Sequence, residues 1–92
     1  MKVFITRKRL IKEFAKEMAY LQMRADKYYY IHKDQNMSDF MLNYASELKD
    51  FSKKLGICND MYQEAYKLYD FRKSGKKDYI PSKEVLERLK KI

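Results

Sequence analysis

Residues 7–33 read RKRLIKEFAKEMAYLQMRADKYYYIHK, and apolar side chains recur through this stretch at intervals of three and four positions. That spacing places side chains on one face of an α-helix, which turns once every ~3.6 residues. Thr6 precedes the stretch and is one of the residue types that cap helix N-termini. The sequence therefore predicts a spine helix about 40 Å long. Its inward face is predicted to carry Ile11, Phe14, Met18, Leu21, Ala25, Tyr28 and His32.

A second helical pattern spans about residues 37–55, after a short polar break at residues 34–36. A break this short folds the second helix back on the first as an antiparallel hairpin. Asn36 or Ser38 is the expected N-cap, and Gly56 is expected to end the helix because glycine readily adopts the left-handed conformation found there. The side chains predicted to face inward are Met37, Met41, Tyr44, Leu48, Phe51 and Leu55.

Two shorter helices are predicted in the C-terminal part of the chain, over about residues 60–72 and 82–91. Their start signals are Asn59 as N-cap with Asp60 in the first turn of the third helix, and Pro81 with Ser82 before the fourth. The side chains expected to face inward are Met61, Ala65 and Leu68 in the third helix, and Val85, Leu86, Leu89 and Ile92 in the fourth.

Composition supports a single all-α domain over residues 1–92, a small helical bundle built on a long antiparallel helical hairpin with two shorter C-terminal helices. Only two Gly and one Pro interrupt the chain, while nine Tyr and five Phe supply surface to bury. A pairing of residues 1–5 with Tyr79 and Ile80 as two strands is a further possibility for the N-terminus. Cys58 is the single cysteine and is expected to act as a small buried hydrophobe.

Several features predict a cytoplasmic protein without membrane contact. One cysteine excludes an intramolecular disulfide, which is typical of a reducing compartment. The start of the chain lacks the apolar segment of a signal peptide, and the longest apolar run is far too short to cross a bilayer. The excess of Lys over Arg, with many Tyr, Ile and Asn, is a bias of AT-rich bacterial or phage genomes, and favours a phage or mobile-element origin.

The residue types needed for catalysis do not come together in this sequence, and we expect no enzymatic activity. His32 and Cys58 should lie near opposite ends of the second helix, roughly 25 to 30 Å apart. No pattern of His, Cys, Asp and Glu matches a metal site, and the two glycines are isolated, so neither a metal nor another cofactor is predicted.

A helix-turn-helix spacing is present over residues 46–65, with Gly56 at the turn. Residues 59–71, which would contain the groove-reading helix, hold one basic and three acidic side chains. Negative charge there opposes contact with DNA phosphates, so the sequence argues against a DNA-reading motif of this type.

The net charge of +8 is concentrated near two ends of the sequence. Clustered positive charge is typical of a polyanion partner, and neighbouring aromatic side chains such as Tyr69, Phe71 and Tyr79 are suited to stacking on unpaired bases. The leading hypothesis is therefore a non-enzymatic binder of nucleic acid or a nucleoprotein, and the alternative is a lysine-rich surface that only maintains solubility. The residues assigned to nucleic-acid contact are Arg7, Arg9, Lys12, Arg72, Lys73, Lys76, Lys77 and Tyr79.

A second stripe on the first helix contains Tyr20, Met23 and Tyr30. Exposed Tyr and Met supply adaptable contact area at protein interfaces. The stripe suggests a homodimer, or a stoichiometric inhibitor or adaptor that binds an acidic-surfaced protein, such as an anti-CRISPR-like inhibitor of a host defence nuclease. The structural alternative is that the third and fourth helices cover these side chains.

Overall fold

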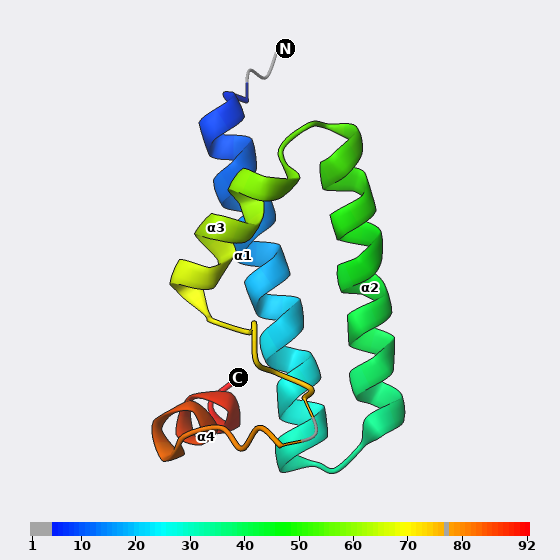
Figure 1. The fold of residues 1–92 in the computed structure, drawn as a ribbon, viewed down its shortest axis with the longest axis vertical. Helices are drawn as coiled ribbons and strands as arrows, with labels where there is room; N and C mark the ends of the chain where they lie inside the picture. The colour runs from blue at the N-terminus through cyan, green and yellow to red at the C-terminus, as the bar shows by residue number, and fades with distance from the viewer. Residues whose placement is uncertain (1–4, 77) are drawn as a thin grey trace.

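The computed structural model describes residues 5–76 and 78–92, which fold into a small helical bundle 44 × 25 × 24 Å in extent. Figure 1 shows α1 and α2 running antiparallel, with α3 against the first half of α1 and α4 near its end. No strand occurs among the described residues. The predicted all-α fold is confirmed. Its elements are α1 (Arg7–Asp26), the π-helix η1 (Lys27–Ile31), α2 (Gln35–Lys54), α3 (Cys58–Leu68) and α4 (Lys83–Lys90).

The spine helix starts as predicted, because the Thr6 side chain accepts a hydrogen bond from the backbone N–H of Arg9 at 3.2 Å. Its far end differs from the prediction of regular α-helix to residue 33. The last turn widens into η1, and the His32 N–H donates to the carbonyl of Lys27, five residues back. Lys33 then has a φ of 54° and reverses the chain. Periodicity alone cannot distinguish a π-turn from an α-turn over so few residues.

The N-cap of α2 is Asp34, and not Asn36 or Ser38 as predicted. Helix α2 begins at Gln35, so Asp34 holds the capping position and its Oδ1 accepts from Met37 N at 3.0 Å. Ser38 lies one turn inside the helix and is buried. Gly56 ends the helix as predicted, with a φ of 71° that disfavours any residue carrying a Cβ.

The buried face of α2 differs from the predicted one. Tyr44, Phe51 and Leu55, predicted to face inward, are 50%, 53% and 41% exposed. Small side chains on the adjacent face let α2 approach its neighbours closely, and that closer packing turns the aromatic side chains outward. The buried α2 residues are Ser38, Met41, Ala45 and Ser52.

Helix α3 starts and ends earlier than predicted. Its N-cap is Ile57, so Asn59 lies within the first turn and does not cap, whereas Asp60 is in the first turn as expected. The helix ends at Leu68 because Tyr69 adopts an extended backbone that buries its side chain. Leu68 is 43% exposed, which corrects its predicted inward position.

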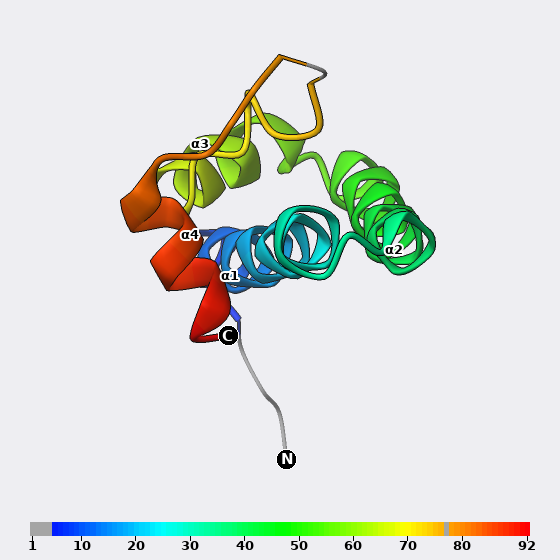
Figure 2. The same cartoon turned by 90° about the horizontal axis from the view of Figure 1, so that it is seen from below.

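Close packing of α1 and α3 forms the centre of the core. Met61 and Ala65 on α3 are fully buried, and they join Ala15, Met18 and Ala19 of α1 in one cluster. Alanines at this contact bring the two helix backbones near each other. Figure 2 shows α3 on one side of the α1–α2 pair, and α4 on the far side of α1 from α2.

Helix α4 starts as the sequence predicts. The Ser82 hydroxyl accepts from Val85 N at 3.3 Å, and Leu89 is fully buried. Residues 1–4 lie outside the described residues, so the suggested pairing with Tyr79 and Ile80 does too. Among the helices described, none combines the length and the apolar character that a membrane span requires.

Candidate nucleic-acid interface

The two predicted basic clusters lie at different ends of α1. Arg7 is the first residue of α1, whereas the second cluster follows α3 and is attached near Asp26, the last residue of α1. Nineteen residues of helix separate these points, which corresponds to roughly 29 Å. The structure therefore does not unite the clusters in one site.

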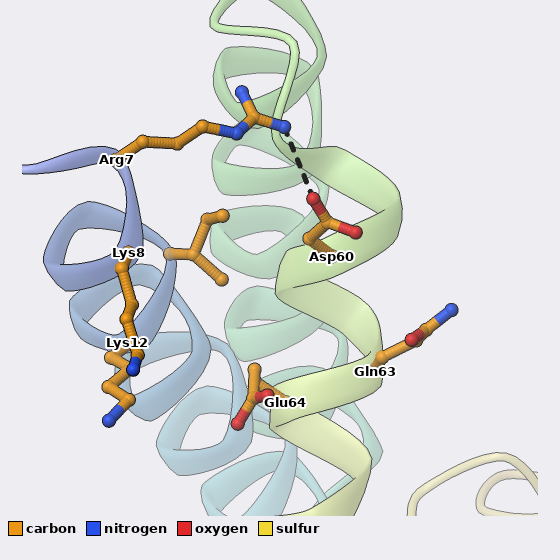
Figure 3. Close-up of a pocket in the computed structure, with 7 residues that line it drawn as sticks. Arg7, Lys8, Lys12, Asp60, Gln63 and Glu64 are labelled. Carbon is orange, nitrogen blue, oxygen red and sulfur yellow. Dashed lines mark hydrogen bonds and ion pairs between the residues drawn. The ribbon is translucent and has the colours of Figure 1, made fainter.

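The N-terminal cluster borders a hollow of about 420 Å³ between α1 and α3, shown in Figure 3. Arg7 reaches across it, and its Nη2 lies 3.1 Å from Asp60 Oδ2 and 3.2 Å from the carbonyl of Gly56. Glu64 places a second carboxylate opposite Lys8 and Lys12 in the same view. Two carboxylates beside three cations make this hollow a poor fit for a polyanion.

The second cluster borders a groove of about 470 Å³ between the end of α3, the following segment and α4. Three cations line it, and only one carboxylate, that of Asp70. Three tyrosines also line the groove, and Tyr66 and Tyr79 are the more accessible of them because Tyr69 is buried. The charged and aromatic lining residues are Lys67, Lys73, Arg88, Asp70, Tyr66, Tyr69 and Tyr79.

The charge of Asp70 is offset by Arg72. The Arg72 guanidinium donates to both carboxylate oxygens, with Nε to Oδ1 at 2.9 Å and Nη2 to Oδ2 at 2.6 Å. These hydrogen bonds lower the pKa of Asp70 to about 2. The Arg72 guanidinium also lies 5.1 Å from the centre of the Tyr66 ring, in a cation–π contact. Counting Arg72, four cations line or adjoin the groove, against the carboxylate of Asp70 and that of Glu64, which lies 3.2 Å from Lys67.

A buried carboxylate fixes the segment that carries this groove. Asp26 is 5% exposed, and its Oδ2 accepts hydrogen bonds from the hydroxyl of Tyr69 and from Ser74 Oγ, the latter at 2.7 Å. Burial raises the pKa of Asp26, and the two hydrogen bonds partly oppose that effect. Burial, followed by the hydrogen bond to Asp26, raises the pKa of Tyr69 well above its ordinary value. A further hydrogen bond fixes the segment to η1, because Gly75 N donates to Tyr30 Oη at 3.1 Å.

Part of the predicted site is assembled by this segment. Lys73 and Tyr79 line the groove, and Arg72 adjoins it. Lys76 is exposed on the same segment, and Lys77 lies outside the described residues. Arg7, Arg9 and Lys12 are at the other end of α1. Tyr69 and Phe71 are 6% and 8% exposed, so neither is available to stack on a base.

Three groove residues were not predicted, namely Tyr66, Lys67 and Arg88. Lys67 is the one basic residue of an acidic stretch, and Arg88 follows Lys67 by twenty-one positions. Neither residue belongs to a run of basic side chains in the sequence, so charge clustering could not identify them. The two side chains come together only through the placement of α4 in the folded chain.

The tyrosine and methionine stripe of α1 is mostly used inside the fold. Met23 packs against the core, and Tyr30 is half-buried with its hydroxyl on Gly75. Tyr20 is 45% exposed, with the Arg24 guanidinium 5.6 Å from its ring centre. Of the three, Tyr20 therefore offers the largest accessible side chain.

Groups suited to other chemistry are dispersed. His32 precedes α2 and Cys58 begins α3, so α2 separates them along its full length. Within residues 5–76 and 78–92, no three His, Cys, Asp or Glu side chains are grouped to hold a metal ion. The chain matches no protein-family model, no curated protein and no solved structure.

Proposed function

We propose that this protein is a non-enzymatic binder of unpaired nucleic acid, which it holds in the groove between α3 and α4. The observation that carries the proposal is the combination of three lining cations with Tyr66 and Tyr79 in one concave site. Cations that follow a phosphate backbone, together with aromatic side chains that stack on bases, are the two components of single-strand recognition. A protein of the phage or mobile-element type, located in the cytoplasm, is consistent with such a role.

Each cation has a distinct position in the proposed contact. Lys73 comes from the segment fixed by Asp26, Arg88 from α4, and Lys67 from the last turn of α3. Lys67 also lies 3.2 Å from Glu64, but both side chains are exposed, and such a surface pair is readily exchanged for a phosphate. Because two of the three cations are lysines, backbone contact with little base preference is expected.

Binding is expected to depend on salt and on the groove cations. Three phosphate contacts to a single strand give a salt slope of about −2, so affinity should fall about 20-fold for a fourfold rise in salt. The double variant Lys73→Glu/Arg88→Glu should bind at least about tenfold more weakly on every sequence. Fluorescence anisotropy with labelled single-stranded oligonucleotides of different sequence measures both quantities.

The matched control is Lys49→Glu/Lys53→Glu on α2, which changes the net charge equally. Both residues are exposed and lie away from the groove. The control should retain most of the affinity, because only the general electrostatic attraction is reduced. Equal losses in the two double variants would contradict a localised site and favour a diffuse basic surface.

The alternative function is that of a protein inhibitor or adaptor centred on Tyr20. Capture of a partner from lysate, with and without nuclease treatment, separates the two functions. Captured material that is lost after nuclease treatment supports nucleic-acid binding in the groove. A single protein that survives nuclease and is lost in Tyr20→Ala supports the adaptor, since Tyr20 is the accessible member of its stripe.

A further inference from the structure

An uncovered apolar stripe runs along α2. Its members Phe40, Tyr44, Phe51 and Leu55 are 41–53% exposed. Their spacings of four, seven and four positions place them on one side of the helix, within about 60° of arc. We define these four side chains as the α2 stripe.

The α2 stripe lies on the side of the hairpin away from α3. The Phe51 ring stacks on Phe14 of α1, with ring centres 5.9 Å apart. On α1, Phe14 is about 100° from Ala15 around the helix, whereas Ala15 and Asp26 point within about 20° of each other. Asp26 contacts Tyr69 and Ser74, which follow α3. In Figure 2, none of the described helices covers this opposite side of the α1–α2 pair.

From this geometry we infer that the α2 stripe is the interface of a homodimer, with a second copy of this chain as its occupant. The stripe is symmetric about the midpoint between Glu47 and Leu48. Phe40 and Leu55 are equally distant from that midpoint, and so are Tyr44 and Phe51. Two antiparallel α2 helices related by a twofold axis there place Tyr44 against Phe51 of the partner subunit, and Phe40 against Leu55 of the partner subunit.

Charge favours a second copy at this helix over the basic ends of the chain. The protein carries a net charge of +8, which makes two copies repel each other. Helix α2 holds three basic and three acidic side chains and is therefore neutral. Two copies that meet along α2 avoid the basic ends of the molecule.

The area of the stripe is close to the smallest that a specific dimer needs. Four large side chains about half exposed leave roughly 400 Å² of apolar surface on each copy. Two copies therefore contribute roughly 800 Å², and the half-buried Met37 and Leu48 beside the stripe add to it. The total approaches the ~1,000 Å² of the smallest specific interfaces, which corresponds to a reversible dimer.

Analytical ultracentrifugation of the full chain over a wide concentration range tests this interface. The expected result is a reversible species of twice the 11.3 kDa mass of one chain. Tyr44→Glu and Phe40→Glu should each weaken the dimer at least about tenfold, because they place a charge against an apolar side chain. A chain that stays monomeric at every concentration would overturn the proposal, even if the stripe binds another molecule.

Leu42→Glu is the matched control on the same helix. Leu42 is 40% exposed but points about 160° away from Tyr44 around the helix. It should leave the dimer unchanged, and a dimer as sensitive to Leu42→Glu as to Tyr44→Glu would contradict the assigned face. The helical circular dichroism signal of each variant shows whether that variant is folded. If Tyr44→Glu does not fold, Phe40→Glu takes its place in the test.

Glu47→Gln tests the twofold arrangement itself. The midpoint of the stripe brings Glu47 close to Glu47 of the partner subunit, and two like charges oppose association. Removing this charge should strengthen the dimer about threefold or more, while Asp39→Asn, farther from the axis, should not. Unchanged affinity in Glu47→Gln would contradict the antiparallel register.

Discussion

Replacing Met61 by alanine is expected to lower the free energy of unfolding by about 3 kcal/mol. The Met61 side chain is fully buried in the cluster that joins α3 to α1. The same cluster contains Ala15, Ala19 and Ala65, whose side chains cannot reach into the space left behind, and the flexible Met18 is its one other buried methionine. Much of the cavity therefore remains, and its cost adds to the lost burial of the methionine. Denaturant unfolding followed by circular dichroism measures the change.

Leu68→Ala is the control on the same helix. Leu68 is 43% exposed, so its removal leaves a notch in the surface that water can fill. The expected loss is less than about 1 kcal/mol. If Leu68→Ala proved as damaging as Met61→Ala, the orientation of α3 described above would be wrong.

The periodic spacing of apolar residues was enough to predict the four helices and the hairpin. It failed on α2 because that helix carries apolar side chains over two adjacent faces. Tyr44 and Ala45 are neighbours in sequence, and hydrophobicity alone favours burying the tyrosine. Close approach of the helices instead favours the alanine, which is 3% exposed while Tyr44 is 50% exposed. Side-chain volume at a helix contact depends on the partner helix, which a one-dimensional pattern does not contain.

The candidate site was predictable to the extent that it is contiguous in sequence. Lys73 and Tyr79 were identified because they belong to a basic segment with aromatic neighbours. Arg88 joins them only because α4 packs on η1 and α1, which places it across the groove from the end of α3. That arrangement depends on the contact of Tyr69 with Asp26, forty-three positions apart. From the sequence alone, an acidic residue near the end of a helix, such as Asp26, is expected to be a solvent-exposed charge. Its buried hydrogen-bond partners become known only from the folded structure.

Asp26→Ala is expected to lower the free energy of unfolding by about 2 kcal/mol and to weaken nucleic-acid binding. The change removes the acceptor of the Tyr69 hydroxyl and of Ser74 Oγ, and leaves a buried phenol without a partner. The segment that bears Lys73 then loses its hydrogen bonds to Asp26 of α1. Tyr69→Phe removes one of the two hydrogen bonds and should cost about 1 kcal/mol. Exposed Asp39→Ala, with no such contact, should change stability by less than about 0.5 kcal/mol.

The effect of Asp26 on stability should also depend on pH, in a direction that its burial determines. Burial raises the pKa of Asp26 above the ordinary value of 3.8, so the folded protein retains this proton over a range in which the unfolded chain has lost it. The contribution of Asp26 is therefore complete below about pH 3.8 and is lost as the pH rises through the raised pKa. Asp70, with a pKa lowered to about 2, acts in the opposite direction: its contribution is present above pH 3.8 and is lost as the pH falls toward 2.

A comparison of wild-type protein with Asp26→Asn isolates the first contribution, because Asp70 is common to both and cancels in the difference. The stability advantage of the wild type should be largest in acid and should decrease toward neutral pH, since the asparagine amide has no proton to lose in this range. Urea unfolding of both proteins across that range measures the difference. An advantage that instead grows with rising pH would mean that the hydrogen bonds from Tyr69 and Ser74 outweigh burial, so that the folded carboxyl ionises more readily than the unfolded one.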